Sequence, residues 1–178
     1  MKYKSELIKS MNYLGKKKDT IFIGQATEYA GTAMTGTLSQ INKKKIYEFP
    51  VAEEMQMGVS IGLSLNGFIP VTIYPRWNFL ILAANQIVNH LDKLKKMSSE
   101  NLKHKVIIRT SVGSKRPLNP QHQHVGNFSS AFKKLLTNIE IIELKEPYQI
   151  FKSYKKAYER KDGKHTLLVE YGDYINEK

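Results

Sequence analysis

Cysteine is absent from the 178-residue sequence, which excludes a disulfide framework, a thiolate metal site and a cysteine nucleophile. The absence also removes any sequence mark of an oxidising compartment, where disulfides form and persist. Long hydrophobic runs are lacking too, since none approaches the roughly 18 to 20 residues that a membrane-spanning helix needs. Residues 1–18 alternate lysine with apolar residues and lack the apolar core of a signal peptide. We therefore expect a cytoplasmic protein that does not associate with a membrane.

Acidic residues are scarce relative to basic ones: 16 Asp and Glu stand against 28 Lys and Arg, a net charge of +12. Nucleic-acid-binding surfaces usually interleave arginine or aromatic residues with lysine in a recognisable module. Neither feature accompanies the lysine clusters, which lie at 16–18, 43–45, 93–96, 133–134 and 155–156. Such clusters are more often solvated surface. We do not expect nucleic acid as a partner, and a basic nucleic-acid-associated protein stays an alternative.

Hydrophobic residues make up 41% of the chain, which is enough for a packed core, and the length fits one domain over 1–178. Short β-branched or aromatic runs predict strands at 21–24, 46–49, 68–74, 105–110, 139–144 and 166–171. Helical spacing or composition predicts helices at 1–16, 30–41, 52–65, 79–97, 125–136 and 147–159. Strand and helix alternate, which predicts a doubly wound α/β fold with a mostly parallel sheet and helices on both faces.

Ligands of such folds bind just beyond the carboxyl ends of the strands. The segments to inspect are therefore 24–29, 50–54, 75–79 and the long polar stretch 111–126. The long stretch is typical of a functional loop. No glycine-rich phosphate loop occurs in the sequence, so the chain has no phosphate cradle of its own.

Two carboxylates, Glu53 and Glu54, open a predicted helix directly after a buried strand. Acidic residues in a first helical turn complement the helix dipole, which explains many such pairs. The alternative is a carboxylate held at the mouth of the sheet to accept a hydrogen bond. The following helix is nearly uncharged through Leu65, which favours a buried helix with a charge at its head.

His122 and His124 form an H-x-H pair in the polar stretch. A metal site would need a third ligand, and none is obvious nearby, so we expect no metal ligands in this chain. Substrate binding or proton transfer by a loop histidine is one interpretation, and a solvated loop is another. Tyr74, Trp77 and Phe79 form an aromatic group, which could serve either as core or as a ligand platform.

Three segments share an order that is typical of a known family: EFPVAEEMQMGVSIGLSLNGFIPV at 48–71, IYPRWNFLILAANQIVNHLDKL at 73–94 and PQHQHVGNFSSAF at 120–132. They resemble the pyrimidine-binding domain of thiamine-diphosphate enzymes. The similarity is to the β subunit of 2-oxo acid dehydrogenase E1 components and to the central domain of transketolase. The segments 139–159 and 165–171 resemble the strand, helix and strand that close this domain.

The resemblance implies roles for three residues. Glu53 matches the glutamate that bonds N1′ of the cofactor's aminopyrimidine, where a carboxylate promotes the tautomer that takes the C2 proton. Phe79 matches the aromatic residue that packs on the pyrimidine ring. His122 matches the active-site histidine that faces the substrate. The Pro-x-x-Glu spacing favours Glu53 over Glu54.

Other positions depart from the family pattern and imply a different substrate pocket. Arg76 and Trp77 are candidates for it, and His124 is a further candidate beside His122. Lys115 and Arg116 suit an anionic group such as a carboxylate or a sugar phosphate.

The resemblance also implies a partner. Nothing here resembles the family's Gly-Asp-Gly and Asn motif for Mg²⁺ and diphosphate, and we expect the chain to lack the family's further C-terminal domain. We expect a hetero-oligomer, as a heterotetramer, with an E1 α-like subunit that holds Mg²⁺. The implied reaction is decarboxylation of a 2-oxo acid with acyl transfer. The alternatives are transketolase-like ketol transfer on sugars and a non-catalytic protein.

Overall fold

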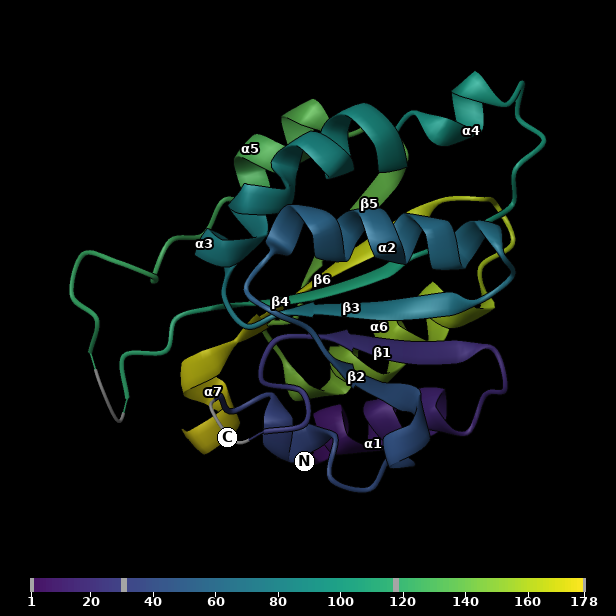
Figure 1. The fold of residues 1–178 in the computed structure, drawn as a ribbon. Helices are drawn as coiled ribbons and strands as arrows, with labels where there is room; N and C mark the ends of the chain where they lie inside the picture. Colours follow the sequence, from purple (N-terminus) through teal and green to yellow (C-terminus); the bar gives the residue numbers. More distant parts are fainter. Residues whose placement is uncertain (1, 30–31, 117–118, 178) are drawn as a thin grey trace.

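A computed structural model describes residues 2–29, 32–116 and 119–177, which form a six-stranded sheet between two helical layers (Figure 1). The strand order is β2-β1-β3-β4-β6-β5, and every neighbouring pair is parallel. The strands are β1 (Thr20–Gly24), β2 (Ile46–Glu48), β3 (Ile69–Tyr74), β4 (Ile107–Val112), β5 (Ile139–Glu143) and β6 (His165–Tyr171). The predicted fold class is confirmed.

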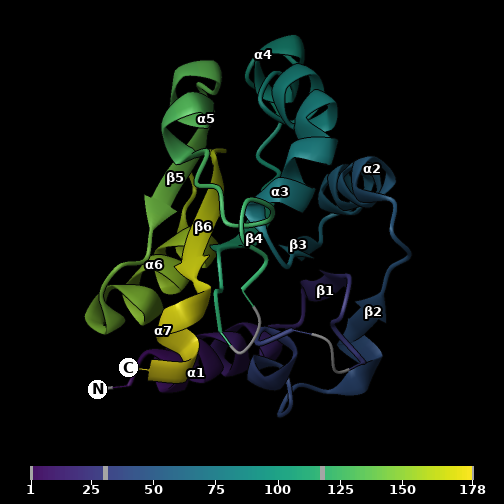
Figure 2. The same ribbon diagram turned by 90° about the vertical axis from the view of Figure 1, so that its left-hand side faces the viewer.

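Helices cover both faces of the sheet, each over its own hydrophobic core (Figures 1 and 2). One layer contains α1 (Tyr3–Gly15), α6 (Pro147–Glu159) and α7 (Gly172–Glu177). The other contains α2 (Glu53–Leu65), α3 (Trp77–Leu80), α4 (Leu94–Met97) and α5 (Ser129–Leu135). The periodicity of α1 works as predicted, because Leu7, Met11 and Leu14 are all fully buried. Over the described residues, no helix has both the length and the apolar content needed to cross a membrane.

The helix predicted at 30–41 is wrong for the described residues 32–41, which form loops around one short 3-10 turn, η1 (Thr35–Thr37). Residues 30 and 31 lie outside the described part of the chain. Threonine competes with helical hydrogen bonding because its hydroxyl can bond nearby backbone groups. Two threonines do so here: Thr35 donates to the carbonyl of Ala26 at 2.6 Å, and Thr37 donates to the carbonyl of Met34 at 2.6 Å.

The single helix predicted at 79–97 is also wrong, because the segment is broken into α3, a 3-10 turn η3 (Ile81–Ala83), a π-helix η4 (Gln86–Leu91) and α4. Tertiary contacts of Asp92 explain the break. The buried Asp92 carboxylate accepts the backbone N–H groups of Thr137 at 2.8 Å and Asn138 at 2.6 Å. The Asp92 N–H donates to the carbonyl of Ile87, five residues earlier, as a π-turn requires.

A buried ion pair joins the neighbouring strands β4 and β6. Arg109 Nε and Nη2 donate to the two carboxylate oxygens of Glu170, at 2.6 and 3.0 Å. Tyr154 on α6 donates to the same carboxylate at 2.5 Å. Arg109 and Glu170 are fully buried, so the pair belongs to the frame of the sheet.

All strands run in one direction, so the sheet has two chemically distinct edges. The segments that follow the strands gather at the carboxyl edge, which lies on the left of Figure 1 and faces the viewer in Figure 2. The segments that precede the strands gather at the opposite edge, the amino edge. The carboxyl edge is the place where parallel sheets bind ligands.

Candidate active site

Glu53 is the first residue of α2, and α2 begins shortly after β2 at the carboxyl edge. Glu53 is only 5% exposed, yet its carboxylate makes no hydrogen bond or salt bridge with the described residues. The position is fixed by its neighbours. Tyr74 donates to the Glu53 carbonyl at 3.2 Å, and Gln56 donates to Thr72 at 2.9 Å and to the Ile73 carbonyl at 3.1 Å. A buried carboxylate with both oxygens available is thus held at the head of a helix.

Glu54 is placed differently from Glu53, although the two are adjacent. Its side chain is exposed, and its Oε1 accepts hydrogen bonds from Asn85 at 2.9 Å and from Gln86 at 3.5 Å. Glu54 therefore ties α2 to η4. Of the two carboxylates, Glu53 is the one left free to meet a ligand.

A cleft of about 730 Å³ opens at the ends of β1, β3 and β4. Its walls include Gln25, Arg76, Phe79, Ser111 and Arg116. Three of the residues predicted for the site, namely Arg76, Phe79 and Arg116, thus share one cavity. Glu53 lies at the same edge of the sheet but lines a separate, shallower groove.

His124 contacts Phe79: the two ring centroids are 5.0 Å apart and the planes are tilted by 46°. Arg76 holds the histidine's backbone, since its Nη1 donates to the His124 carbonyl at 3.0 Å. The His124 Nδ1 is buried without a hydrogen-bond partner among the described residues. His122 is exposed, and none of its side-chain atoms has a polar contact in the described structure. The geometry brings His124, rather than the predicted His122, to the aromatic ring of Phe79.

Trp77 does not line the cleft, contrary to the expectation of a substrate contact. The residue is fully buried, with its ring centroid 6.3 Å from that of Phe128 and 5.0 Å from that of Phe132. The indole therefore packs into the core between α3 and α5. Lys115 is exposed beside the cleft, and its backbone N–H donates to Asp173 at 2.9 Å.

Sequence reasoning missed Glu48, the last residue of β2, which shapes the wall of the cleft. Its carboxylate accepts the backbone N–H groups of Ala26 at 2.6 Å and of Thr27 and Glu28, both at 2.8 Å. Burial on its own would raise the pKa of the Glu48 carboxyl, but these backbone hydrogen bonds outweigh burial and lower the pKa. In the sequence, the sign of this role was the acidic residue itself, Glu48, placed five residues before Glu53.

The loop that Glu48 holds also depends on Gly24 at the end of β1. A Cβ on Gly24 would lie 2.4 Å from the carbonyl oxygen of Ile73 on β3. The absent side chain allows the chain to turn close against β3 and enter the loop. Glu48 and Gly24 together set the path of residues 25–28 along the cleft.

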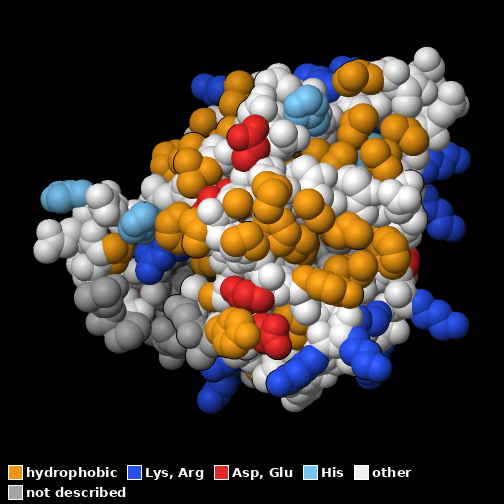
Figure 3. Space-filling model, in the orientation of Figure 1, with side chains coloured by type: hydrophobic (Ala, Val, Ile, Leu, Met, Phe, Trp, Pro, Cys, Tyr) orange, Lys and Arg blue, Asp and Glu red, His pale blue; other side chains and the backbone are white. Residues whose placement is uncertain are grey.

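An apolar patch surrounds the opening next to Glu53. Val51 is 81% exposed, Leu82 60% and Met55 53%, and Val59 on α2 is exposed as well. Met55, Val59 and Leu82 line the groove of about 760 Å³ that Glu53 also lines, and Val51 directly precedes Ala52, which lines it too. Figure 3 shows hydrophobic side chains gathered across this face of the molecule, over α2 and below it.

Among the residues that the structure describes, no group of three His, Asp or Glu side chains is arranged to hold a metal ion.

Comparison with solved structures supports the fold. A chain described as "Split gene transketolase, inactive beta4 tetramer" superposes with a TM-score of 0.71 at 18% sequence identity. The match covers 97% of this chain and 52% of that chain.

Curated relatives share the name pyruvate dehydrogenase E1 component subunit beta. The protein from Gracilaria tenuistipitata var. liui is 28% identical over 133 residues, which cover 75% of this chain and 40% of the relative. The protein from Cyanidium caldarium is 25% identical over 161 residues, which cover 89% of this chain and 48% of the relative. The chain thus spans less than half the length of these relatives. The family profile "Transketolase, pyrimidine binding domain" matches residues 6–172. This match confirms the family expected from the sequence motifs, and the chain belongs to the transketolase pyrimidine-binding domain family.

Proposed function

We propose that this chain binds the pyrimidine end of thiamine diphosphate in an enzyme that decarboxylates a 2-oxo acid and transfers the acyl group. The observation that carries the proposal is the Glu53 carboxylate, which is buried, unbonded and fixed at the carboxyl edge of a family member's sheet. Burying a charged group without a partner is costly, so such a group is typical of a site completed by a ligand.

The residues present fit one half of the cofactor. An aminopyrimidine needs a carboxylate to bond a ring nitrogen and an apolar wall for its face. Glu53, in its groove, provides the first, and the partly buried ring of Phe79, in the separate cleft, provides the second, so we infer that the aminopyrimidine spans both hollows. Thiamine diphosphate, when bound, supplies the nucleophilic carbon for breaking or making a C–C bond beside a carbonyl. The part played by Glu53 is to hold a proton or hydrogen bond at its carboxylate oxygen.

We assign the role predicted for His122 to His124 instead. The His124 ring lies against Phe79, and its Nδ1 has no hydrogen-bond partner in the described structure. An imidazole in this position can bind the substrate or transfer a proton. Arg76 and Arg116 line the same cleft, where their charge suits a carboxylate or phosphate of the substrate.

The other half of the cofactor site must come from an E1 α-like partner that carries the Mg²⁺ and diphosphate ligands. The apolar patch of Val51, Met55, Val59 and Leu82 is the surface we assign to subunit contact, because it borders Glu53. The structural neighbour is described as an inactive tetramer of β chains, so chains of this kind can also associate with one another. A heterotetramer, a single domain over 1–178 and a cytoplasmic location remain predictions.

Ketol transfer on sugars is the second candidate, because the structural neighbour is named as a transketolase. The two candidates share Glu53 and Phe79. They differ in the substrate, which would bind in the cleft beside Arg76 and Arg116.

The deciding experiment recovers the tagged chain with its partner from the cells that make it. The complex is assayed with thiamine diphosphate and Mg²⁺ on a panel of 2-oxo acids and a panel of ketose phosphates. Turnover of a 2-oxo acid that disappears in Glu53→Gln supports the proposal. Turnover confined to ketoses selects the second candidate. A complex that turns over either substrate equally well in the Glu53→Gln form contradicts the site.

A further inference from the structure

The amino edge carries most of the net charge of the protein. The segments 16–19, 43–45, 100–105 and 160–164, which precede β1, β2, β4 and β6, contain 11 basic and 3 acidic residues. Their net charge of +8 is two thirds of the +12 of the whole chain. The segments that follow the strands, at 25–29, 49–54, 75–76, 113–128, 144–146 and 172–177, contain 4 basic and 6 acidic residues. The charge is therefore concentrated at one edge.

Four of the 11 basic side chains of the amino edge are engaged within the chain. Lys17 lies over the rings of Tyr13 and Tyr158, and Arg160 is bonded to Asp162. Lys45 and Lys105 point inward, where they donate to the carbonyls of Lys17 and of Tyr158 and Arg160. Seven others are exposed and make no side-chain hydrogen bond or salt bridge within the described residues: Lys16, Lys18, Lys43, Lys44, Lys103, Lys161 and Lys164. Like charges gathered at one edge repel one another and weaken the folded state. An anionic partner would remove that repulsion.

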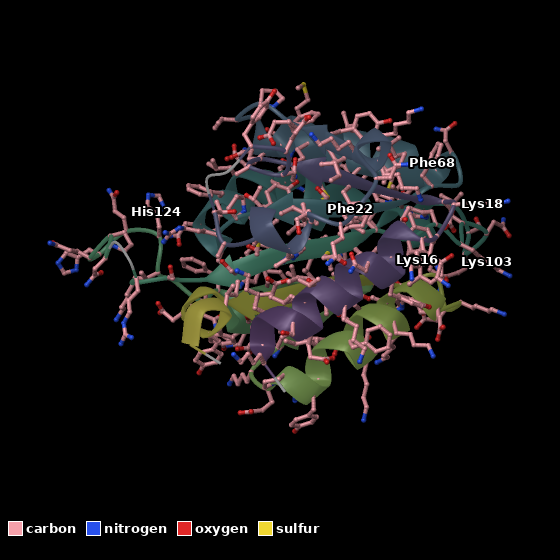
Figure 4. All side chains as sticks on the ribbon, turned by 90° about the horizontal axis from the view of Figure 1, so that it is seen from below. Lys16, Lys18, Phe22, Phe68, Lys103 and His124 are labelled. Carbon is pink, nitrogen blue, oxygen red and sulfur yellow. The ribbon has the colours of Figure 1, made fainter. Side chains whose placement is uncertain are left out.

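An exposed aromatic residue lies in the middle of this charged edge. Phe68 directly precedes β3, and the strand order places β3 between β1 and β4. Phe68 is 39% exposed, and the N–H of the next residue, Ile69, donates to the carbonyl of Asp19 at 2.7 Å. Figure 4 shows Lys16, Lys18, Phe68 and Lys103 at one end of the molecule and His124 at the other.

The composition of the edge favours a protein partner over nucleic acid. Arg160 is its only arginine, and that guanidinium is already bonded to Asp162 at 2.8 Å and to Thr166 at 2.6 Å. Bidentate phosphate recognition uses free arginines, and binding of single strands uses several aromatic rings. We propose that the amino edge is a docking surface for an acidic segment of a partner protein, with an apolar side chain of that segment packed on Phe68. The proposal is independent of the proposed function, because this edge lies opposite the cleft.

The test measures binding of a short fluorescein-labelled polyglutamate peptide with one central phenylalanine to the full chain, by anisotropy at low ionic strength. The variant Lys16→Glu/Lys18→Glu/Lys103→Glu reverses three exposed charges of the edge. Lys4→Glu/Lys134→Glu/Lys152→Glu makes the same charge change on the helical faces, at side chains that are exposed and unbonded. Circular dichroism verifies that both variants fold.

We expect the edge variant to raise the Kd roughly tenfold or more, since it replaces three attractive contacts with the acidic peptide by three repulsive ones. The control variant should change the Kd less than about twofold, and added salt should weaken binding by the wild type. Phe68→Ala should weaken binding of the phenylalanine-containing peptide but should leave binding of plain polyglutamate unchanged. Equal losses in the two triple variants, or no binding by the wild type, would overturn the proposal. Tighter binding of a single-stranded RNA oligonucleotide at the same lysines would assign the edge to nucleic acid instead.

Discussion

The carboxyl edge and the amino edge of the sheet are built from segments that differ in charge and in their unbonded groups. The carboxyl edge holds 4 basic and 6 acidic residues in its segments. Two of its unbonded polar groups lie at hollows: Glu53 lines the groove, and His124 contacts Phe79, which lines the cleft. The amino edge holds 11 basic and 3 acidic residues, and its unbonded charges are lysines that point into solvent. Unbonded groups in a hollow indicate a small ligand, whereas unbonded charges on an open rim indicate a large one.

Buried titratable groups also differ between the edges. At the amino edge, His104 and His165 lie with ring centroids 4.9 Å apart, and both residues are buried. His165 Nδ1 accepts the Val106 N–H at 3.1 Å, which requires an unprotonated nitrogen. Burial, followed by the neighbouring His104, lowers the pKa of His165 to about 3. This pair belongs to the fold, whereas the histidine of the carboxyl edge lies at a cleft.

The largest effect that we expect separates Glu53 from Glu54. In the complex assembled with its diphosphate-binding partner, Glu53→Gln should lower turnover by roughly 10²- to 10⁴-fold, the scale of a lost acid–base contact. Glu54→Gln should lower the stability of the fold by at most about 1 kcal/mol and leave turnover nearly unchanged. Glu54 contributes only a surface contact and a favourable interaction with the helix dipole. The measurement is hydrogen–deuterium exchange at C2 of the bound cofactor, followed by NMR. Slower exchange in Glu54→Gln alone would shift the site by one residue.

A substitution in the middle of the sheet, between the two edges, should lower the stability of the whole fold. Arg109→Met leaves Glu170 buried without its ion-pair partner, and we expect a loss of about 3 to 5 kcal/mol in the free energy of unfolding. Denaturant unfolding measures the loss. The double variant Arg109→Met/Glu170→Gln removes the stranded charge and should recover part of the stability. A silent single variant would show that the pair does not stabilise the sheet.

The sequence predicts the frame of this protein better than its site, for physical reasons. Every strand boundary was predicted within two residues, because β-branched runs between polar segments have few alternatives in a parallel sheet. The break at η4 was not predicted, since it depends on Asp92 binding the backbone of residues 137 and 138, more than forty positions away. Local periodicity contains no trace of such a contact.

The site shows the same limit at closer range. Glu53 and Phe79 were selected by resemblance, and both lie at the carboxyl edge. The choice between His122 and His124 depends on the course of a long loop, in which Gln121 and His124 take positive φ values of 55° and 59°. Two histidines two residues apart cannot be ranked until that course is known.

The third prediction ranks those two histidines. His124→Ala should lower turnover of the assembled enzyme by roughly 10²-fold if its ring transfers a proton, while cofactor affinity changes little. His122→Ala should have almost no effect, because its ring is exposed. Steady-state kinetics at a series of cofactor concentrations separates the effect on turnover from the effect on cofactor affinity. A large loss in His122→Ala alone would restore the assignment made from the resemblance.

The smallest effect concerns pH and the amino edge. The pKa of His165 is about 3 in the folded state, below its ordinary value of about 6.5. The unfolded chain therefore binds the proton first. The contribution of His165 to the free energy of unfolding is complete above about pH 6.5. It falls by up to about 1.4 kcal/mol per pH unit as the pH drops toward 3. Denaturant unfolding between about pH 7 and 5 measures the slope. His165→Asn keeps an acceptor for the Val106 N–H and should flatten it; an unchanged slope would assign the acid sensitivity to other groups.

The carboxylate of Glu48 links two parts of the molecule that would otherwise open separately. β2 is a three-residue strand at the border of the sheet and pairs only with β1, so it belongs to the least stable part of the sheet. The amide protons of Ala26, Thr27 and Glu28 are shielded by Glu48 at the end of that strand. These amides should therefore exchange with solvent deuterium together with those of β2, as one cooperative opening unit. The shape of the cleft wall is thus only as long-lived as the border strand that supports it.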